Sequence, residues 1–212
     1  MLSEWELGRH TTSVRYRKIL SAYYVSPPDV LFAHQDAQPV ALDETPRLLV
    51  GYPDLRKALV ATAREAEHFL AIAGSRSRDK GYLNTIEISL AERPGVVHYR
   101  ILFGPPRHPV LVDHLLRLLE LRDPDCWSQG LKTPHIGLID GDPHMPERFF
   151  CVSEQAAVVP IPSLNSAEVF DSGVLLGPKA AERLIDHTRQ CYAAARRVES
   201  ADEIQKFALS QG

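Results

Sequence analysis

The chain has 212 residues, of which 44% are apolar, and its formal net charge at neutral pH is −3. This length and apolar content suit one domain with a small appendage and exclude a globally disordered chain. Composition alone predicts no nucleic-acid binding, because there is no basic surplus, so any contact with DNA must be local. The start, MLSEWELGRH, is no secretory signal, and no apolar run approaches the roughly 20 residues that span a bilayer. We therefore expect a cytoplasmic protein with no membrane partner.

The N-terminal part is predicted to be helical. Residues 1–33 contain SVRYRKILSAYY (13–24), which places Ile19, Leu20 and Tyr23 on one helix face. The segment VSPPDVLFA (25–33) has a Ser-Pro-Pro-Asp start that is typical of a short helix. Residues 34–50 are polar and contain proline, which predicts a linker.

From residue 51 onward, helical and strand patterns alternate. Helices are expected over 52–69, 81–95 and 108–123, and buried strands over 69–74 and 96–104. Further strands are predicted at 135–140, 148–153, 156–162 and 173–177, followed by a long helix over 178–198 and a frayed tail over 199–212. This order predicts a mixed-sheet α/β sandwich. Its first two strands, joined by a helix, should be parallel, and the later strands antiparallel.

Cysteine and histidine spacing predicts neither a metal nor a cofactor. Cys126, Cys151 and Cys191 are far apart, form no Cys-x-x-Cys pair and have no obvious histidine partner nearby in the sequence, which favours reduced, buried thiols. The nine histidines show no His-x-His or His-Glu-x-x-His spacing. The segment HIGLIDGDPH (135–144) offers histidines and aspartates, but a strand followed by an Asp-Gly-Asp-Pro turn explains it better than a metal cluster.

An anion or ligand site is predicted in AGSRSRDKG (73–81), which follows a strand. Loops at the carboxyl ends of strands are where open α/β sheets bind ligands. The segment matches no phosphate-binding glycine motif, so a solvated loop is favoured over a site. The predicted pocket comprises Ser75, Arg76, Ser77, Arg107, His108 and His135.

The segment LSEWELGRHTTSVRYRKILSAYYVSPPDVLF (2–32) resembles the C-terminal half of the XRE (lambda-repressor/Cro-like) helix-turn-helix family. The matching positions are Ser3, Trp5, Glu6, Gly8, Arg9, Ile19, Leu20, Tyr23, Val25, Ser26, Asp29, Leu31 and Phe32. The resemblance implies that SEWELGRH ends a recognition helix, the one placed in the major groove of DNA. Its preceding helices are absent here, which predicts either a natural start upstream of Met1 or a decayed module.

The resemblance also implies which residues lie near DNA. These DNA-proximal residues are Ser3, Arg9, Arg15, Arg17 and Lys18. Phosphate contacts of this kind weaken steeply with salt, and the missing helices predict that DNA binding is weak or lost in this chain. The alternative for residues 1–33 is a packing or dimerisation arm.

Residues 51–198 resemble one half of a phospholipase D-like fold. The resemblance rests on the order of helices and strands, on ILFG and HIGLID, and on SGVLLGPKAAERLIDHTRQCYAAA. The family signature is a histidine nucleophile, a lysine two residues later that holds the phosphate, and an aspartate five residues further. His135 and Asp142 have the right separation, but Gly137 stands in the place of the lysine. The broken motif predicts that the domain does not catalyse.

A homodimer is also expected. The helix over 108–123 carries more leucines than one apolar stripe, so a core position and a dimer seam both explain it. Halves of the phospholipase D-like fold pair, and Cro-type repressors bind paired half-sites, so the two resemblances favour the dimer.

The sequence therefore predicts a bacterial XRE-type transcriptional regulator. Its C-terminal α/β domain would sense a ligand, associate with itself, or both. One alternative is a phospholipase D-like phosphodiesterase or nucleotide-handling enzyme, with His135 or the Ser75–Arg78 loop in its site. A further alternative is a pure protein-interaction domain.

Overall fold

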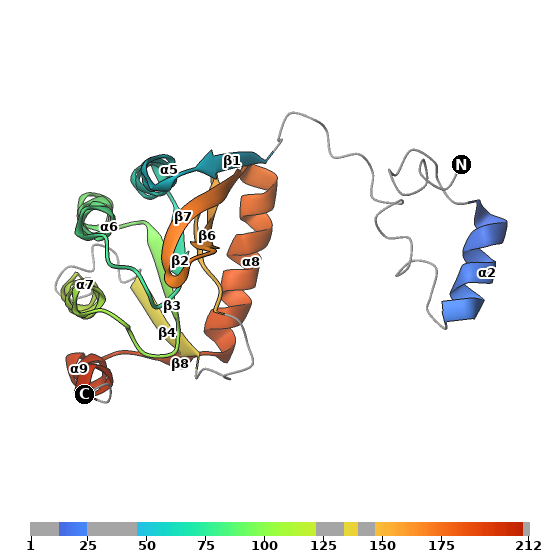
Figure 1. The fold of residues 1–212 in the computed structure, drawn as a ribbon. Coiled ribbons are helices and arrows are strands. Elements are labelled where there is room, and N and C mark those ends of the chain that lie inside the picture. The colour runs from blue at the N-terminus through green and yellow to red at the C-terminus, as the bar shows by residue number, and fades with distance from the viewer. Residues whose placement is uncertain (1–12, 25–45, 122–133, 140–146, 210–212) are drawn as a thin grey trace. The chain divides into compact units, whose positions relative to one another are not determined.

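The structure is a computed structural model that describes residues 13–24, 46–121, 134–139 and 147–209 (Figure 1). The chain divides into two compact units, Met1–Glu44 and Thr45–Gly212. The described residues of the first unit form α2 (Val14–Tyr24), on which Tyr16, Ile19 and Tyr23 are exposed. The predicted helix over 25–33, and the positions of Ser3 and Arg9, lie outside the described residues.

The second unit is built on one mixed sheet. Eight strands of the described part are ordered β1-β7-β6-β5-β2-β3-β4-β8. Their bounds are β1 (Arg47–Val50), β2 (Phe69–Ala73), β3 (Val97–Phe103), β4 (Pro134–Ile139), β5 (Phe150–Ser153), β6 (Ala157–Ser163), β7 (Ser166–Leu176) and β8 (Arg196–Arg197). β2, β3 and β4 are parallel neighbours, and the other pairs are antiparallel. The predicted mixed α/β fold is confirmed, with β4 as an additional parallel strand.

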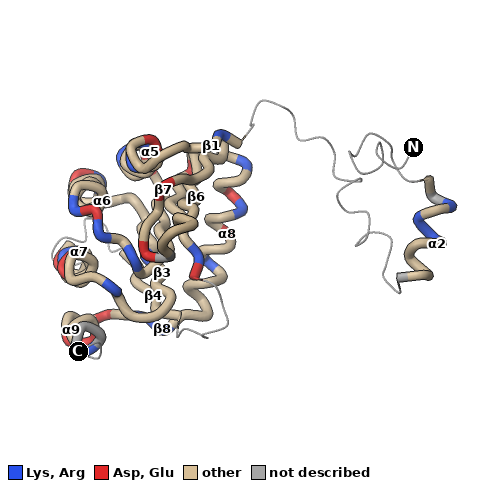
Figure 2. Tube along the Cα trace, in the orientation of Figure 1, with Lys and Arg blue, Asp and Glu red and all other residues tan. Residues whose placement is uncertain are grey.

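Helices cover both faces of the sheet. On one face lie α5 (Tyr52–Glu65), α6 (Lys80–Glu92), α7 (Pro109–Glu120) and α9 (Ala201–Leu209), while α8 (Pro178–Ala194) lies on the other (Figure 1). α5, α7 and α8 begin with proline in the first turn, where its missing N–H costs nothing. Most charged residues lie on the helices, and the strands carry few charged residues (Figure 2). Each helix therefore presents an apolar side to the sheet.

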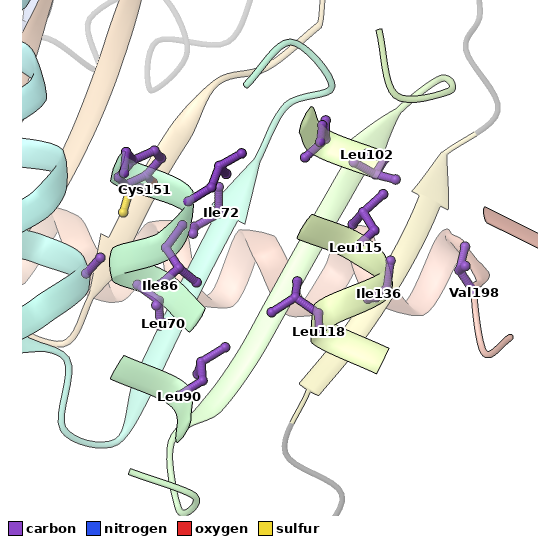
Figure 3. Close-up of a cluster of buried hydrophobic side chains, with 14 of the residues drawn as sticks. Leu70, Ile72, Ile86, Leu90, Leu102, Leu115, Leu118, Ile136, Cys151 and Val198 are labelled. Carbon is purple, nitrogen blue, oxygen red and sulfur yellow. The ribbon is translucent and has the colours of Figure 1, made fainter. Parts of the chain in front are cut away.

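The larger core lies between the sheet and the four helices on its first face. Leu70 and Ile72 of β2, Leu102 of β3 and Ile136 of β4 meet Ile86 and Leu90 of α6 and Leu115 and Leu118 of α7 there (Figure 3). Leu111, Leu115 and Leu118 are fully buried. These α7 leucines are core residues and are not available for a dimer seam, so the expected homodimer stays a prediction that rests on the resemblances.

Two segments differ from the expectations. Residues 47–50, placed in the predicted linker, form β1, because Leu49 is buried and the strand pairs with β7. The predicted frayed tail contains α9, which packs with α7 through the buried Ile204. In both cases tertiary contacts outweigh weak local propensity. Within the described ranges, no helix is both long enough and apolar enough to cross a membrane.

Candidate functional site

The carboxyl edge of β2 and β3 is shaped by two glycines. Gly74 and Gly104 follow these strands with φ values of 123° and 78°, in the region that favours glycine. A Cβ on Gly74 would lie only 2.7 Å from Cδ1 of Phe149. Glycine at this position therefore lets the aromatic ring of Phe149 pack directly against the end of β2.

Ser75 and Arg76 meet a buried carboxylate at this edge. The backbone N–H of Ser75 donates to Oε1 of Glu147 at 2.5 Å, and Nε of Arg76 pairs with Oε2 of the same side chain at 2.6 Å. The Ser75 hydroxyl also accepts from the N–H of Phe103 at 2.9 Å. Arg107 pairs with Glu168 at 2.7 Å beside this group. The structure thus brings three predicted anion-site residues together, but carboxylates of the chain already engage their polar groups.

A cavity of about 500 Å³ opens beside this edge, on the face of the sheet that α5 covers. Its walls are aromatic and aliphatic, with charged groups at the rim. The lining residues are Tyr52, Leu55, Leu59, Ile72, Ala73, Arg76, Ser77, Arg78, Asp79, Tyr82, Phe149, Phe150, Pro160, Glu168, Val169, Phe170 and Asp171. The ring centroids of Phe149 and Phe170 lie 4.5 Å apart in an edge-to-face arrangement. Cζ of Arg76 is 5.3 Å from the centroid of the Phe149 ring.

Asp79 fixes one side of this cavity. Its carboxylate caps α6 by accepting from the N–H of Tyr82, and it accepts from the hydroxyl of Tyr52 at 2.5 Å and from Arg56 at 2.7 Å. Burial opposes ionisation of Asp79, but these hydrogen bonds outweigh it and lower its pKa. Burial and the bond to Asp79 raise the pKa of Tyr52 to about 12. The network holds α5 against the start of α6.

A buried arginine lies behind the cavity wall. Arg100 of β3 is fully buried, and its Nη2 donates to the carbonyl of Gly74 and to Oγ of Ser77, both at 3.1 Å. Burial lowers its pKa to about 10, so it stays protonated at neutral pH. Within the described part of the chain, Nε and Nη1 of Arg100 have no hydrogen-bond partner.

A second group of polar side chains lies on the α8 face. Arg148, just before β5, donates to Nε2 of His187, and Sγ of Cys191 lies 3.3 Å from the same nitrogen. Burial and the Arg148 charge lower the pKa of His187, and burial raises the pKa of the Cys191 thiol. The expectation that no cysteine has a nearby histidine is therefore wrong. The four-residue spacing on one helix was the signal that could have revealed this pair.

The remaining predicted site residues lie elsewhere. His135 is on the α8 face of β4, stacked on Tyr99 with ring centroids 4.8 Å apart. His108 stands at the N-cap position of α7, without a side-chain capping bond, and lies outside the cavity lining. Their predicted role in an anion pocket stays a prediction. On α2, Arg15 and Lys18 are exposed and Arg17 is half-buried. The described residues contain no cluster of three or more metal-binding side chains, and Asp140, Asp142 and His144 lie outside them.

Gly137 lies where the expected motif would need lysine. A Cβ at this position would be 3.0 Å from Cβ of Ala195 and 3.1 Å from Cδ2 of Tyr192. α8 and the residues that follow it pack directly on this part of β4. In the sequence as a whole, no histidine is followed two residues later by lysine.

Comparisons place this fold among known structures. No protein-family model and no curated protein matches the sequence. Solved structures do match, among them Nuc of Salmonella typhimurium, a phospholipase D family member (10% identity, TM-score 0.50), and NucT of Helicobacter pylori (12%, 0.51). Each match covers 74% of this chain and 100% of the other. TrmBL2, an archaeal chromatin protein described as binding DNA, matches at 13% identity with a TM-score of 0.50, over 93% of this chain and 68% of its own.

These comparisons correct the predicted function. They contradict an XRE-type transcriptional regulator with a non-catalytic domain, because phospholipase D-like structures agree better with the alternative prediction of an enzyme. Nothing in them supports an XRE helix-turn-helix in residues 1–33, and the DNA binding of TrmBL2 is a property of that protein. At these identities the likeness concerns the fold alone. The chain from residue 45 onward has a phospholipase D-like fold.

Proposed function

We propose that the unit from residue 45 onward binds a small organic molecule with a flat, apolar body in the cavity between α5 and β7. The observation that carries this proposal is the aromatic wall of the cavity, formed by Tyr52, Phe149 and Phe170 around about 500 Å³. Cavities of this size with mostly apolar walls and a few polar groups are typical of small-molecule sites. Aromatic rings offer large contact area to a flat ligand at low entropic cost.

The charged groups at the rim of the cavity favour a ligand with polar substituents over a purely apolar one. Arg78 is exposed at the rim, and Asp79, Glu168 and Asp171 supply carboxylates around it. Both donors and acceptors are therefore within reach of polar substituents on a ring. A few such groups fix orientation, while the apolar wall contributes most of the buried area.

Ligand-observed NMR with a panel of neutral and acidic aromatic fragments tests this proposal. Val169→Trp fills the cavity from β7 with little risk to folding, because Val169 is only half-buried. Ile88→Trp adds the same ring at an exposed position of α6 outside the cavity. We expect fragments that bind the wild type and Ile88→Trp but not Val169→Trp. The proposal fails when no fragment binds, or when all three proteins bind alike.

Phosphodiester hydrolysis is the second candidate function, and the contact between Arg148 and His187 favours it. The lowered pKa of His187 leaves its imidazole neutral and therefore nucleophilic at neutral pH. In the proposed step, the bound phosphate draws the Arg148 guanidinium away from Nε2 of His187, and the freed Nε2 lone pair forms a P–N bond. The P–O bond to the leaving alkoxide breaks at the same time, and the alkoxide takes a proton from the water that next attacks phosphorus. Water then displaces the imidazole from phosphorus, releasing a phosphate monoester. Arg148 would stabilise the negative charge on the phosphoryl oxygens.

The chromogenic diester bis(4-nitrophenyl) phosphate tests this second function. We expect slow release of 4-nitrophenol by the wild type, which His187→Gln abolishes. His68→Gln is the matched control, because His68 is exposed at the far end of β2. Hydrolysis that persists in His187→Gln, or that the wild type lacks, rules out this role for His187.

A further inference from the structure

We propose that the ligand of the cavity between α5 and β7 carries an acidic group, a carboxylate or phosphate, that pairs with Arg100. This inference rests on the proposed binding function and names its ligand class. The observation behind it is a fully buried guanidinium beside the cavity, with two nitrogens that have no acceptor in the described part of the chain.

Arg100 is adjacent to the cavity through three lining residues. Ile72 lies opposite Arg100 in the register of β2 and β3, and Ser77 accepts a hydrogen bond from Nη2 of Arg100. Tyr82 is close enough that its hydroxyl and the Arg100 charge affect each other's ionisation. The guanidinium therefore borders the part of the cavity wall that Ile72, Ser77 and Tyr82 form.

Among the residues that the structure describes, no carboxylate pairs with this charge. Burial raises the pKa of the neighbouring Cys151 thiol to about 12 and that of Tyr82 well above its usual value, so both are neutral at physiological pH. His98 on the same strand is also neutral, since burial lowers its pKa to about 3. The charge of Glu147 acts on Arg100, but Ser75 and Arg76 already engage the Glu147 carboxylate.

An uncompensated buried charge is costly, and a ligand anion would remove that cost. A buried cation needs a counterion or several hydrogen-bond acceptors. Of the three guanidinium nitrogens of Arg100, only Nη2 has acceptors among the described residues. A carboxylate or phosphate oxygen accepts charge-assisted hydrogen bonds from a guanidinium, which are stronger than neutral ones. The hydroxyl of Ser77, which accepts from Arg100, keeps its own proton to donate to the same anion.

Three naphthalene probes separate this inference from the proposed function. 2-Naphthoate and 2-naphthyl phosphate carry the two acidic groups, and 2-naphthalenemethanol is the neutral counterpart with the same flat body. We expect calorimetry to show that at least one acid binds the wild type about tenfold more tightly than the alcohol does, as a charge-assisted bond implies. The acid that binds with the lower Kd then shows whether the natural ligand carries a carboxylate or a phosphate.

Arg100→Gln should abolish this preference and leave binding of the alcohol unchanged, because glutamine keeps a donor for Gly74 but carries no charge. Arg93→Gln is the control: Arg93 also donates to backbone carbonyls, those of Arg64 and Ala66, but at the other end of α6. If Arg100→Gln does not fold, Ser77→Ala replaces it and should weaken binding of the acid more than binding of the alcohol. Binding of the alcohol without preference for either acid overturns the inference only. Failure of all three probes overturns the proposed function as well.

Discussion

The carboxylate of Glu154 accepts a hydrogen bond from the backbone N–H of Phe69 at 3.1 Å, although the two residues are 85 positions apart in the chain. The same carboxylate accepts from the N–H groups of Glu67 and His68. Glu154 follows β5, and its carboxylate thus accepts from the backbone at the start of β2, the strand next to β5. Burial opposes its ionisation, but these backbone bonds prevail and lower its pKa.

Glu154→Gln should therefore destabilise the protein at neutral pH and much less in acid. A lowered folded-state pKa contributes stability above the unfolded value of about 4.3 and loses it as the pH falls through the folded value. We expect a loss of about 1 kcal/mol at pH 7, modest because the side chain is partly exposed to solvent. Thermal unfolding at neutral pH and below about pH 4 measures the difference. The exposed Glu120→Gln should show no such pH-dependent gap, and an equal gap in both variants would contradict the capping role.

Gly74→Ala should damage the cavity as well as the fold. The alanine would adopt a φ that L-residues avoid, and its Cβ would displace the Phe149 ring. We expect a loss of about 1–3 kcal/mol of unfolding free energy and weaker fragment binding. Gly95→Ala is the control, because a Cβ there meets nothing within 4 Å. Equal unfolding midpoints for the two variants would show that Phe149 yields without cost.

Asp79→Ala should loosen the contact between α5 and α6. Loss of the helix cap costs about 1 kcal/mol, and Tyr52 loses both its acceptor and the neighbouring negative charge. The pKa of Tyr52 should then fall from about 12 toward its ordinary value. Titration of tyrosinate absorbance follows this shift, with Asp54→Ala in the first turn of α5 as the control. An unchanged titration of Tyr52 would show that burial alone raises its pKa.

Gly137→Lys, which restores the lysine of the expected motif after His135, should not raise diester hydrolysis above that of the wild type. Ala195 and Tyr192 leave no room for a side chain at position 137, so overpacking should cost about 1–3 kcal/mol. Unfolding by denaturant and a bis(4-nitrophenyl) phosphate assay report the two effects. A stable Gly137→Lys variant that still cleaves the diester when His187→Gln is added would show that His135 can act as a nucleophile after all.

Local patterns in the sequence identify the main elements of the fold but not the short ones. The apolar runs of β2 and β3 and the proline-started α5 and α7 were predicted because each carries its own periodicity. β1 and β8 have four and two residues, and they exist because β7 and β4 offer them partners. Pairing between distant segments leaves almost no trace in so few residues.

Of the candidate site, the sequence predicted the loop after β2 but not the aromatic walls of the cavity. The Ser75–Arg78 segment does lie at the edge of the sheet, because a strand and a glycine precede it. The aromatic walls come from α5, β7 and the approach to β5, and only folding brings Tyr52, Phe149 and Phe170 together. Arg100 sits in an alternating strand pattern, where a charged residue usually faces water, so burial could not be inferred from its neighbours.

β7 belongs to two parts of the molecule at once. Ser172–Leu175 pair with β1, the first strand after residue 45, whereas Glu168–Asp171 line the cavity. Ser172, the residue directly after the lining stretch, therefore already pairs with Val50 of β1. A ligand that packs on Glu168–Asp171 would therefore contact the same strand that holds β1 at the edge of the sheet.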